Sequence, residues 1–298
     1  MNRTLTYTIT PQYAGYLIGD FLRAHGYSRH LIIHLKQTEK GILQNGEWAY
    51  INSALNPNDT LTIQIIEEET SEHIIPVKME LSIVYEDEDI LVINKAADMP
   101  VHPSINNYDN SLANGLAFYF KEQNLPFVFR CINRLDRDTT GLVLLAKNMY
   151  SGCVLSDMVK NREIHREYLA VTEGKLEDSG TVDAPIGRKD DSIIERCIDF
   201  ENGQTAVTHY TRIDYKNSFS LASIVLETGR THQIRVHMKH IGHPLPGDFI
   251  YNPDYSRIKR QALHSHKLSF LHPVTKKAMT FSVPLPEDMK LLLFSTLP

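Results

Sequence analysis

The chain has 298 residues, of which 42% are hydrophobic and 22% charged, with a formal net charge of −5. This composition is that of an ordinary globular protein with room for roughly two domains, and it argues against a surface coated in basic patches. The three cysteines form no CxxC pair, so neither a disulfide framework nor a cysteine zinc site is implied. Because no stretch reads as a signal peptide or a bilayer-length apolar run, we expect a cytoplasmic, monomeric protein with no membrane partner.

The first 70 residues predict a small αβ unit. Apolar residues at helical spacing between Ala14 and Leu22 predict one helix, and Ser28 is a good N-cap for a second. Asn45-Gly46 predicts a hairpin, and the alternating apolar residues at 61–65 predict a strand.

Two short helices, a hairpin and a closing strand resemble the S4-like RNA-binding module. The phrases Lys40–Gly46 and Asn58–Ile63 carry this resemblance, although the second helix is less basic than such modules usually are. The resemblance implies contacts mainly to RNA phosphates and shape. The alternative is a small domain that only packs. The acidic run Glu67–Glu72 is expected to be solvated, which predicts an N-terminal domain over 1–70, a linker over 71–76 and a second domain over 77–298.

The second unit predicts an α+β fold, with a mixed, largely antiparallel sheet and flanking helices. Apolar runs at 83–85 and 90–93 predict a hairpin with an acidic tip, and a helix is expected behind Asn110 or Ser111. Further strands are expected at 166–171, 205–210, 219–226 and 263–270. Thr231 is the expected N-cap of a helix that Gly242 ends.

The stretch Cys131–Gly141 predicts a polar loop between two strands, since Phe127–Phe129 leads in and Leu142–Lys147 leads out. Arg134 and Arg137 bracket Asp136 in this loop. Two guanidinium groups favour an ionised carboxylate and can contact phosphate. From these residue types alone, a polar hairpin loop with a solvated ion pair is the favoured interpretation.

Three sequence motifs, here called phrases, are together far more specific for a protein family than any one of them alone. They are Arg134-Leu-Asp136 with Thr139-Thr-Gly141, Glu227–His237, and Ala262–Phe270. With Asn94-Lys95, Pro100–Pro103 and Arg166–Ala170, they resemble the RluA-type branch of the pseudouridine synthases from about Ile83 to Pro286.

This resemblance implies an isomerase that converts uridine in structured ribosomal or transfer RNA, ribosomal RNA being favoured, without a metal or cofactor. It implies that Asp136 is the essential aspartate, Tyr168 the active-site tyrosine and Arg235 the basic partner of the aspartate. It also implies RNA contacts by Arg134, Asn133, Lys95, His102, Arg137 and Arg230.

The sequence departs from the family pattern at two positions. Asn133 replaces the usual histidine before Arg134, and Ala96 replaces a proline after Lys95. Asparagine cannot carry a charge, so we expect the change at 133 to alter RNA positioning more than chemistry. The histidines at 232, 237, 240 and 243 do not have the spacing of a zincin site, so no metal is expected.

The chemistry explains the residue types. A carboxylate can attack the sugar or assist loss of a proton from it, and the two routes stay open. Arginine suits Asp136 better than lysine because its fork fits a carboxylate bidentately, and Tyr168 offers a ring for stacking and a hydroxyl for proton transfer. The target base has to be extruded from its helix.

Two other functions compete with this one. A non-catalytic RNA-binding protein could keep the fold, and a sugar-cleaving hydrolase could use Asp136 with Asp138. Neighbours on one loop are poorly placed to flank a glycosidic bond as paired carboxylates must.

Overall fold

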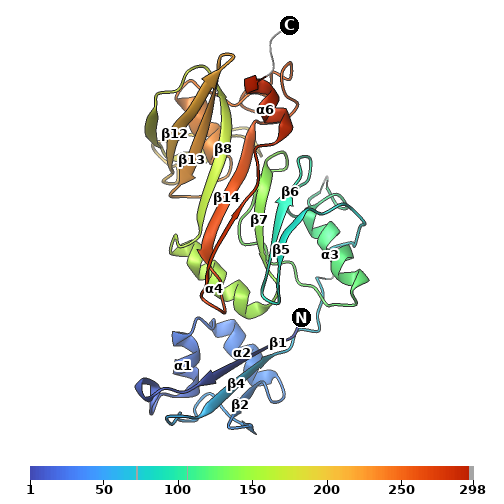
Figure 1. The fold of residues 1–298 in the computed structure, drawn as a ribbon, viewed down its shortest axis with the longest axis vertical. Helices are drawn as coiled ribbons and strands as arrows, with labels where there is room; N and C mark the ends of the chain where they lie inside the picture. The colour runs from blue at the N-terminus through green and yellow to red at the C-terminus, as the bar shows by residue number, and fades with distance from the viewer. Residues whose placement is uncertain (72, 106, 295–298) are drawn as a thin grey trace.

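The computed structural model describes residues 1–71, 73–105 and 107–294, and it places a small N-terminal unit at one end of an elongated molecule (Figure 1). A long sheet forms the body of the second unit, and helix α6 (Glu287–Phe294) lies at the opposite end. No helix in the described ranges is long and apolar enough to cross a membrane.

The N-terminal unit is a four-stranded antiparallel sheet in the order β1-β4-β2-β3, with two helices. The Ser28 hydroxyl accepts the Leu31 amide at 3.2 Å, which confirms the predicted N-cap. Asn45 and Gly46 both have positive φ, as a tight hairpin turn requires. The elements are β1 (Arg3–Thr8), the 3-10 turn η1 (Pro11–Tyr13), α1 (Ile18–Ala24), α2 (Arg29–Gln37), β2 (Ile42–Gln44), β3 (Glu47–Trp48) and β4 (Thr60–Ile65).

The second unit is built on a nine-stranded sheet, which confirms the predicted mixed, largely antiparallel architecture. Its order is β5-β6-β7-β14-β8-β13-β12-β9, with β15 paired to β14, and only β7 and β14 run parallel. The strands are β5 (Ile83–Glu86), β6 (Ile90–Lys95), β7 (Thr140–Ala146), β8 (His165–Glu173), β9 (Ser179–Asp183), β12 (Val207–Lys216), β13 (Phe219–Leu226), β14 (Leu263–Leu271) and β15 (Ala278–Ser282).

Three further helices and a separate small hairpin complete this unit. Ser111 caps α3 through a capping box with Asn114, as a polar residue before an apolar stripe predicts. The remaining elements are α3 (Leu112–Glu122), α4 (Met149–Lys160), α5 (Gln233–His240), β10 (Ile186–Arg188) and β11 (Arg196–Ile198).

The predicted strand at Phe127–Phe129 is wrong. These residues pair with no strand, and Phe127 is instead buried with its ring stacked on Phe120 at a centroid distance of 4.5 Å. A short apolar run signals burial, and burial alone does not require strand pairing.

The two units share a hydrophobic core. Apolar side chains of β1, α1 and α2 pack in one cluster with those of β6, β7 and α4. Arg3 of β1 donates two hydrogen bonds of 2.9 Å to the carboxylate of Asp89, which is only 2% exposed. A buried carboxylate held in this way fixes the N-terminal unit to the sheet.

The acidic run after β4 also takes part in this junction. Glu67 is buried, forms an ion pair with Arg130 and accepts the Met149 amide at 2.9 Å. The prediction of a solvated acidic run is therefore wrong at Glu67, and Glu72 lies outside the described residues.

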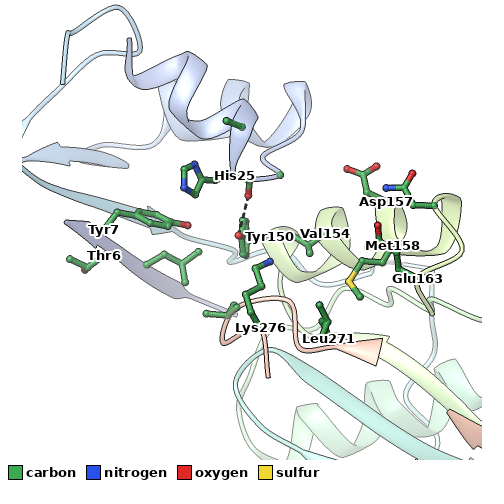
Figure 2. Close-up of a pocket in the computed structure, with 15 residues that line it drawn as sticks. Thr6, Tyr7, His25, Tyr150, Val154, Asp157, Met158, Glu163, Leu271 and Lys276 are labelled. Carbon is green, nitrogen blue, oxygen red and sulfur yellow. Dashed lines mark hydrogen bonds between the residues drawn. The ribbon is translucent and has the colours of Figure 1, made fainter. Parts of the chain in front are cut away.

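A cavity of about 480 Å³ lies at this junction, between β1 and α1 on one side and α4 on the other (Figure 2). The Tyr150 hydroxyl of α4 donates to the carbonyl of His25 at 3.1 Å, the bond drawn in Figure 2. The Tyr150 ring also packs on Tyr27, with centroids 4.6 Å apart. The cavity shares no lining residue with the cleft around Asp136 described below.

Candidate active site

Asp136 lies on the loop that precedes β7, and a buried amide shapes this loop. The Asn133 side chain donates to the carbonyl of Leu142 at 3.1 Å and accepts the amide of Leu144 at 2.8 Å. Asn133 is only 2% exposed. A buried side chain engaged with backbone on both sides has nothing to offer RNA, so the predicted RNA contact by Asn133 is wrong.

The start of β7 requires glycine. Gly141 has a φ of +110° and faces Ser265 of β14, the parallel partner strand. A Cβ at this position would lie 2.2 Å from the Ser265 carbonyl oxygen. The close approach of the two strands fixes where the Asp136 loop leaves the sheet.

Arg235 of α5 is the direct partner of Asp136. Its Nη1 donates to Asp136 Oδ2 at 2.8 Å, which brings together two residues 99 positions apart. Burial alone would lower the pKa of Arg235, but hydrogen bonds to Asp248 and the charges of Asp136 and Asp248 raise it above its ordinary value. The guanidinium is therefore a fixed positive charge beside the Asp136 carboxylate.

The bidentate partner of Arg235 is Asp248 and not, as the sequence suggests, Asp136. Arg235 Nε donates to Asp248 Oδ2 at 2.7 Å, and Nη2 donates to Oδ1 at 2.8 Å. Asp248 is fully buried and also accepts the amides of Ile250 and Tyr251. Sequence reasoning missed this residue, and the only signal for it is an isolated Asp after Pro246-Gly247.

His232 approaches Asp136 from the start of α5. It occupies the N-cap position with a φ of +59°, so the predicted N-cap at Thr231 is wrong. His232 Nδ1 and the Tyr251 hydroxyl share a hydrogen bond of 2.9 Å, and Nε2 lies 3.9 Å from Asp136 Oδ2. Burial lowers the pKa of His232, although Asp136 opposes this effect. A histidine held in the left-handed backbone conformation beside a carboxylate is typical of a functional site.

Tyr168 of β8 lines the same cleft as Asp136, His232 and Arg235. It is 5% exposed, and among the described residues no group forms a hydrogen bond with its hydroxyl. Burial raises the pKa of Tyr168 against the opposing charge of Arg166, with a smaller contribution from Asp136. The phenol is therefore protonated at neutral pH.

Two of the predicted RNA-contacting arginines lie at the mouth of this cleft. Arg134 and Arg230 are both exposed and both line it. Arg137 is exposed nearby, forms an ion pair with Asp138 at 3.0 Å, and lies 5.7 Å from the ring of Phe249. These positions leave three guanidinium groups accessible around Asp136.

His102 is exposed and lies outside the cleft lining. Its ring packs edge-on against Phe129 at a centroid distance of 4.9 Å. Although His102 is exposed, partial burial of its ring, together with the charge of Arg134, lowers its pKa. At neutral pH this favours an uncharged ring, which can stack or accept a hydrogen bond but adds no charge for a phosphate.

Lys95 does not face RNA. It is 1% exposed, and its Nζ donates to the carbonyls of Ala96, Met99 and Arg137 at 2.7–2.8 Å. Burial lowers the pKa of Lys95 to about 7, against the opposing charge of Asp138. Three acceptors match the three protons of an ammonium group, so Lys95 ties two loops together, and its predicted RNA contact is wrong.

The histidines around α5 have separate hydrogen-bond partners. His237 bonds to Thr208 and to the carbonyl of Ala184, and His243 bonds to the carbonyl of Glu173. In the described ranges, the one group of three potential metal ligands is Asp87, Asp89 and His272, at the junction. Asp89 there is already held by Arg3, Asn148 and Ser151.

Comparison with known proteins identifies the family of this chain. A model of the RNA pseudouridylate synthase family matches residues 89–240, about half of the chain. The chain belongs to this family. Its members are isomerases that act on RNA, so this chain is an RNA pseudouridine synthase, and the cleft around Asp136 is its candidate active site.

The relatives cover most of the chain. An uncharacterised RNA pseudouridine synthase, YjbO of Bacillus subtilis, is 42% identical over 90% of this chain and 95% of its own length. The ribosomal large subunit pseudouridine synthase D of Xanthomonas campestris is 37% identical over 84% of this chain and 80% of its own. The solved structure of human RNA pseudouridylate synthase domain containing 1 has a TM-score of 0.60 at 27% identity, over 73% of this chain and 91% of that one.

Proposed function

We propose that this pseudouridine synthase modifies uridines in the RNA of the large ribosomal subunit. Relatives from Xanthomonas campestris and Escherichia coli, 37% and 40% identical, are named for that substrate. The proposal also takes the protein to be a cytoplasmic monomer that needs no metal and no cofactor.

The observation that carries the proposal is the pair of Asp136 and Arg235. A buried guanidinium, itself fixed by Asp248, lies 2.8 Å from a carboxylate at the wall of a cleft. A carboxylate held beside a fixed positive charge can attack the ribose or take a proton from it. Both routes break the C–N bond and leave the uracil free to turn and form the C–C bond.

The other cleft residues have supporting roles in this proposal. The Tyr168 ring stacks on the extruded base, and its protonated hydroxyl donates a hydrogen bond or a proton. Arg134 and Arg230 at the mouth hold the phosphates on either side of the target nucleotide, while Arg137 and His102 contact RNA farther out. Extrusion of the base costs a few kcal/mol, which favours uridines in loops and weak stems.

The N-terminal unit is proposed to be an S4-like RNA-binding domain over 1–70, joined through 71–76 to the catalytic domain over 77–298. Exposed basic residues of α2, Arg29 and Lys36 among them, supply the phosphate contacts.

The test is pseudouridine formation in unmodified ribosomal RNA, detected by chemical labelling. We expect the wild-type protein to form pseudouridine and Asp136→Asn to form none, with RNA binding retained within about tenfold. Asp138→Asn is the matched control, because Asp138 is paired with Arg137 and does not line the cleft. Release of free uracil would indicate the hydrolase alternative, and unchanged uridine the binding protein.

A further inference from the structure

A second polar recess adjoins the active-site cleft. It has a volume of about 390 Å³ and lies between the hairpin β10–β11 and the loop that precedes α5. Three arginines line it, Arg188 and Arg196 from the hairpin and Arg230 from the loop, and Asn202 and Gln204 line it as well.

The three guanidinium groups have no carboxylate partner in the part of the chain that the structure describes. Arg196 donates to the carbonyl of Glu195 at 3.3 Å, and Arg230 donates to that of Thr205 at 3.0 Å. Arg188 and Arg196 are directly opposite each other in the antiparallel register. Like charges in this position destabilise a strand pair, and an anion bound between them would relieve that repulsion.

No acidic side chain of the same hairpin lines the recess, and Asp190 and Asp191 are exposed at its tip. Glu195 forms an ion pair with Lys189 at 2.9 Å. Asp199 accepts the backbone amides of Glu201 and Asn202. Neither carboxylate lines the recess, so the guanidinium groups there are available to a ligand.

The recess adjoins the cleft that holds Asp136. Arg230 lines both. Gly229 lies against Arg166, since a Cβ built on this glycine would be 3.7 Å from the Arg166 guanidinium. The buried Nε of Arg166 has no hydrogen-bond partner, and Arg166 projects from the same face of β8 as Tyr168 two residues later.

We propose that this recess binds phosphodiester groups of the RNA strand that carries the target uridine, with Arg188, Arg196 and Arg230 as the ligands. The proposal rests on the proposed function, because it takes the strand to enter through the Asp136 cleft. Planar guanidinium groups suit phosphate, and such contacts fix register without reading sequence. A recess beside the cleft would hold the backbone next to the extruded nucleotide.

The test is the affinity of the full-length protein for a fluorescent short oligouridylate at several salt concentrations. Arg188→Gln is the main variant, since Arg188 is exposed and its loss leaves the strand backbone intact. We expect several-fold weaker binding, and a salt slope smaller in magnitude by about one for the lost phosphate contact. Arg188→Gln combined with Arg196→Gln should reduce the slope further.

Lys189→Gln is the matched control. It removes the same charge from the adjacent residue, but Lys189 is paired with Glu195 and does not line the recess. We expect its affinity and slope to equal those of the wild type. Equal losses in Lys189→Gln and Arg188→Gln would overturn the proposal, because a general charge effect would then explain both.

Two further measurements distinguish this proposal from the proposed function and from a small-anion site. If the wild type forms pseudouridine but Arg188→Gln binds RNA unchanged, the recess proposal fails and the function stands. If Arg188→Gln selectively loses RNA binding but the wild type forms no pseudouridine, the recess proposal stands and the proposed function fails. Titration with inorganic pyrophosphate alone tests a small-anion site, and tight pyrophosphate binding with unaltered RNA affinity in Arg188→Gln would overturn the RNA assignment.

Discussion

Asp248 holds Arg235 with both carboxylate oxygens and leaves one guanidinium nitrogen to reach Asp136. The two bonds to Asp248 are 2.7 and 2.8 Å, and the remaining bond to Asp136 is 2.8 Å. Because a guanidinium is planar, fixing two of its nitrogens fixes the direction of the third. Asp248 therefore sets the position of the guanidinium charge relative to Asp136, although Asp248 itself does not line the cleft.

We predict that Asp248→Asn lowers the rate of pseudouridine formation at saturating RNA by at least about tenfold, and the free energy of unfolding by about 3 kcal/mol. An amide NH₂ facing a guanidinium cannot accept a hydrogen bond, so Arg235 loses its orientation. RNA affinity should stay within about threefold of the wild type, since Asp248 is buried. Single-turnover rates and RNA titrations measure the two quantities separately.

Asp288→Asn is the control for this variant. Asp288 binds Arg260 through the same two-bond geometry, at 2.7 and 2.9 Å, but Arg260 does not contact Asp136. A comparable loss of activity in both variants would show that stability, and not the orientation of Arg235, explains the effect of Asp248→Asn.

We also predict that Arg235→Lys loses most activity, at least about 100-fold, although it keeps the charge. One ammonium group at the end of a flexible chain cannot hold Asp248 with two bonds and reach Asp136 with a third. Chemical labelling of pseudouridine at fixed reaction times measures the loss of activity, and a thermal unfolding curve checks that the variant is folded. Lysine acting as well as arginine would mean that the three-residue arrangement is unimportant for the reaction.

The third prediction concerns the Tyr168 hydroxyl. Burial raises the pKa of Tyr168 above its ordinary value of 10, so the hydroxyl stays protonated as the pH rises from 7 to about 10. Activity should therefore show no alkaline loss due to Tyr168 over that window. Tyr168→Phe should be slower by about 100-fold and bind RNA normally, because the ring remains. Rates of Tyr168→Phe equal to those of the wild type would restrict Tyr168 to stacking.

The sequence predicts the residues that meet in the cleft, but not how each one is held. Asp136, Tyr168 and Arg235 come from three separate phrases, and the structure brings them to one cleft. The strands and turns of the sheet could also be predicted, from alternating apolar residues and from turn residues. The role of Asp248 could not be predicted, because a single aspartate in a loop becomes informative only when tertiary packing places it against Arg235.

Asn133 and Lys95 show the opposite error. Both lie in family phrases, and polar residues in such phrases invite a role in RNA binding. Each is instead almost fully buried and bonded to backbone groups of neighbouring loops. Sequence patterns do not distinguish a polar side chain that faces a ligand from one that supports a loop, since both have the same chemistry.

The last prediction concerns whether the N-terminal unit binds RNA, and the contacts of this unit determine which variants can test it. Removing 1–69 would expose the shared core and leave the buried Asp89 without Arg3, which costs several kcal/mol. Surface variants avoid this damage. Arg29→Gln with Lys36→Gln on α2 should weaken RNA binding and reduce the magnitude of its salt slope by about two. The control double variant, Lys78→Gln with Lys121→Gln, removes two exposed charges from the catalytic unit and should leave the slope unchanged. If both doubles behave alike, α2 makes no phosphate contacts of its own and the N-terminal unit serves only as packing for α4.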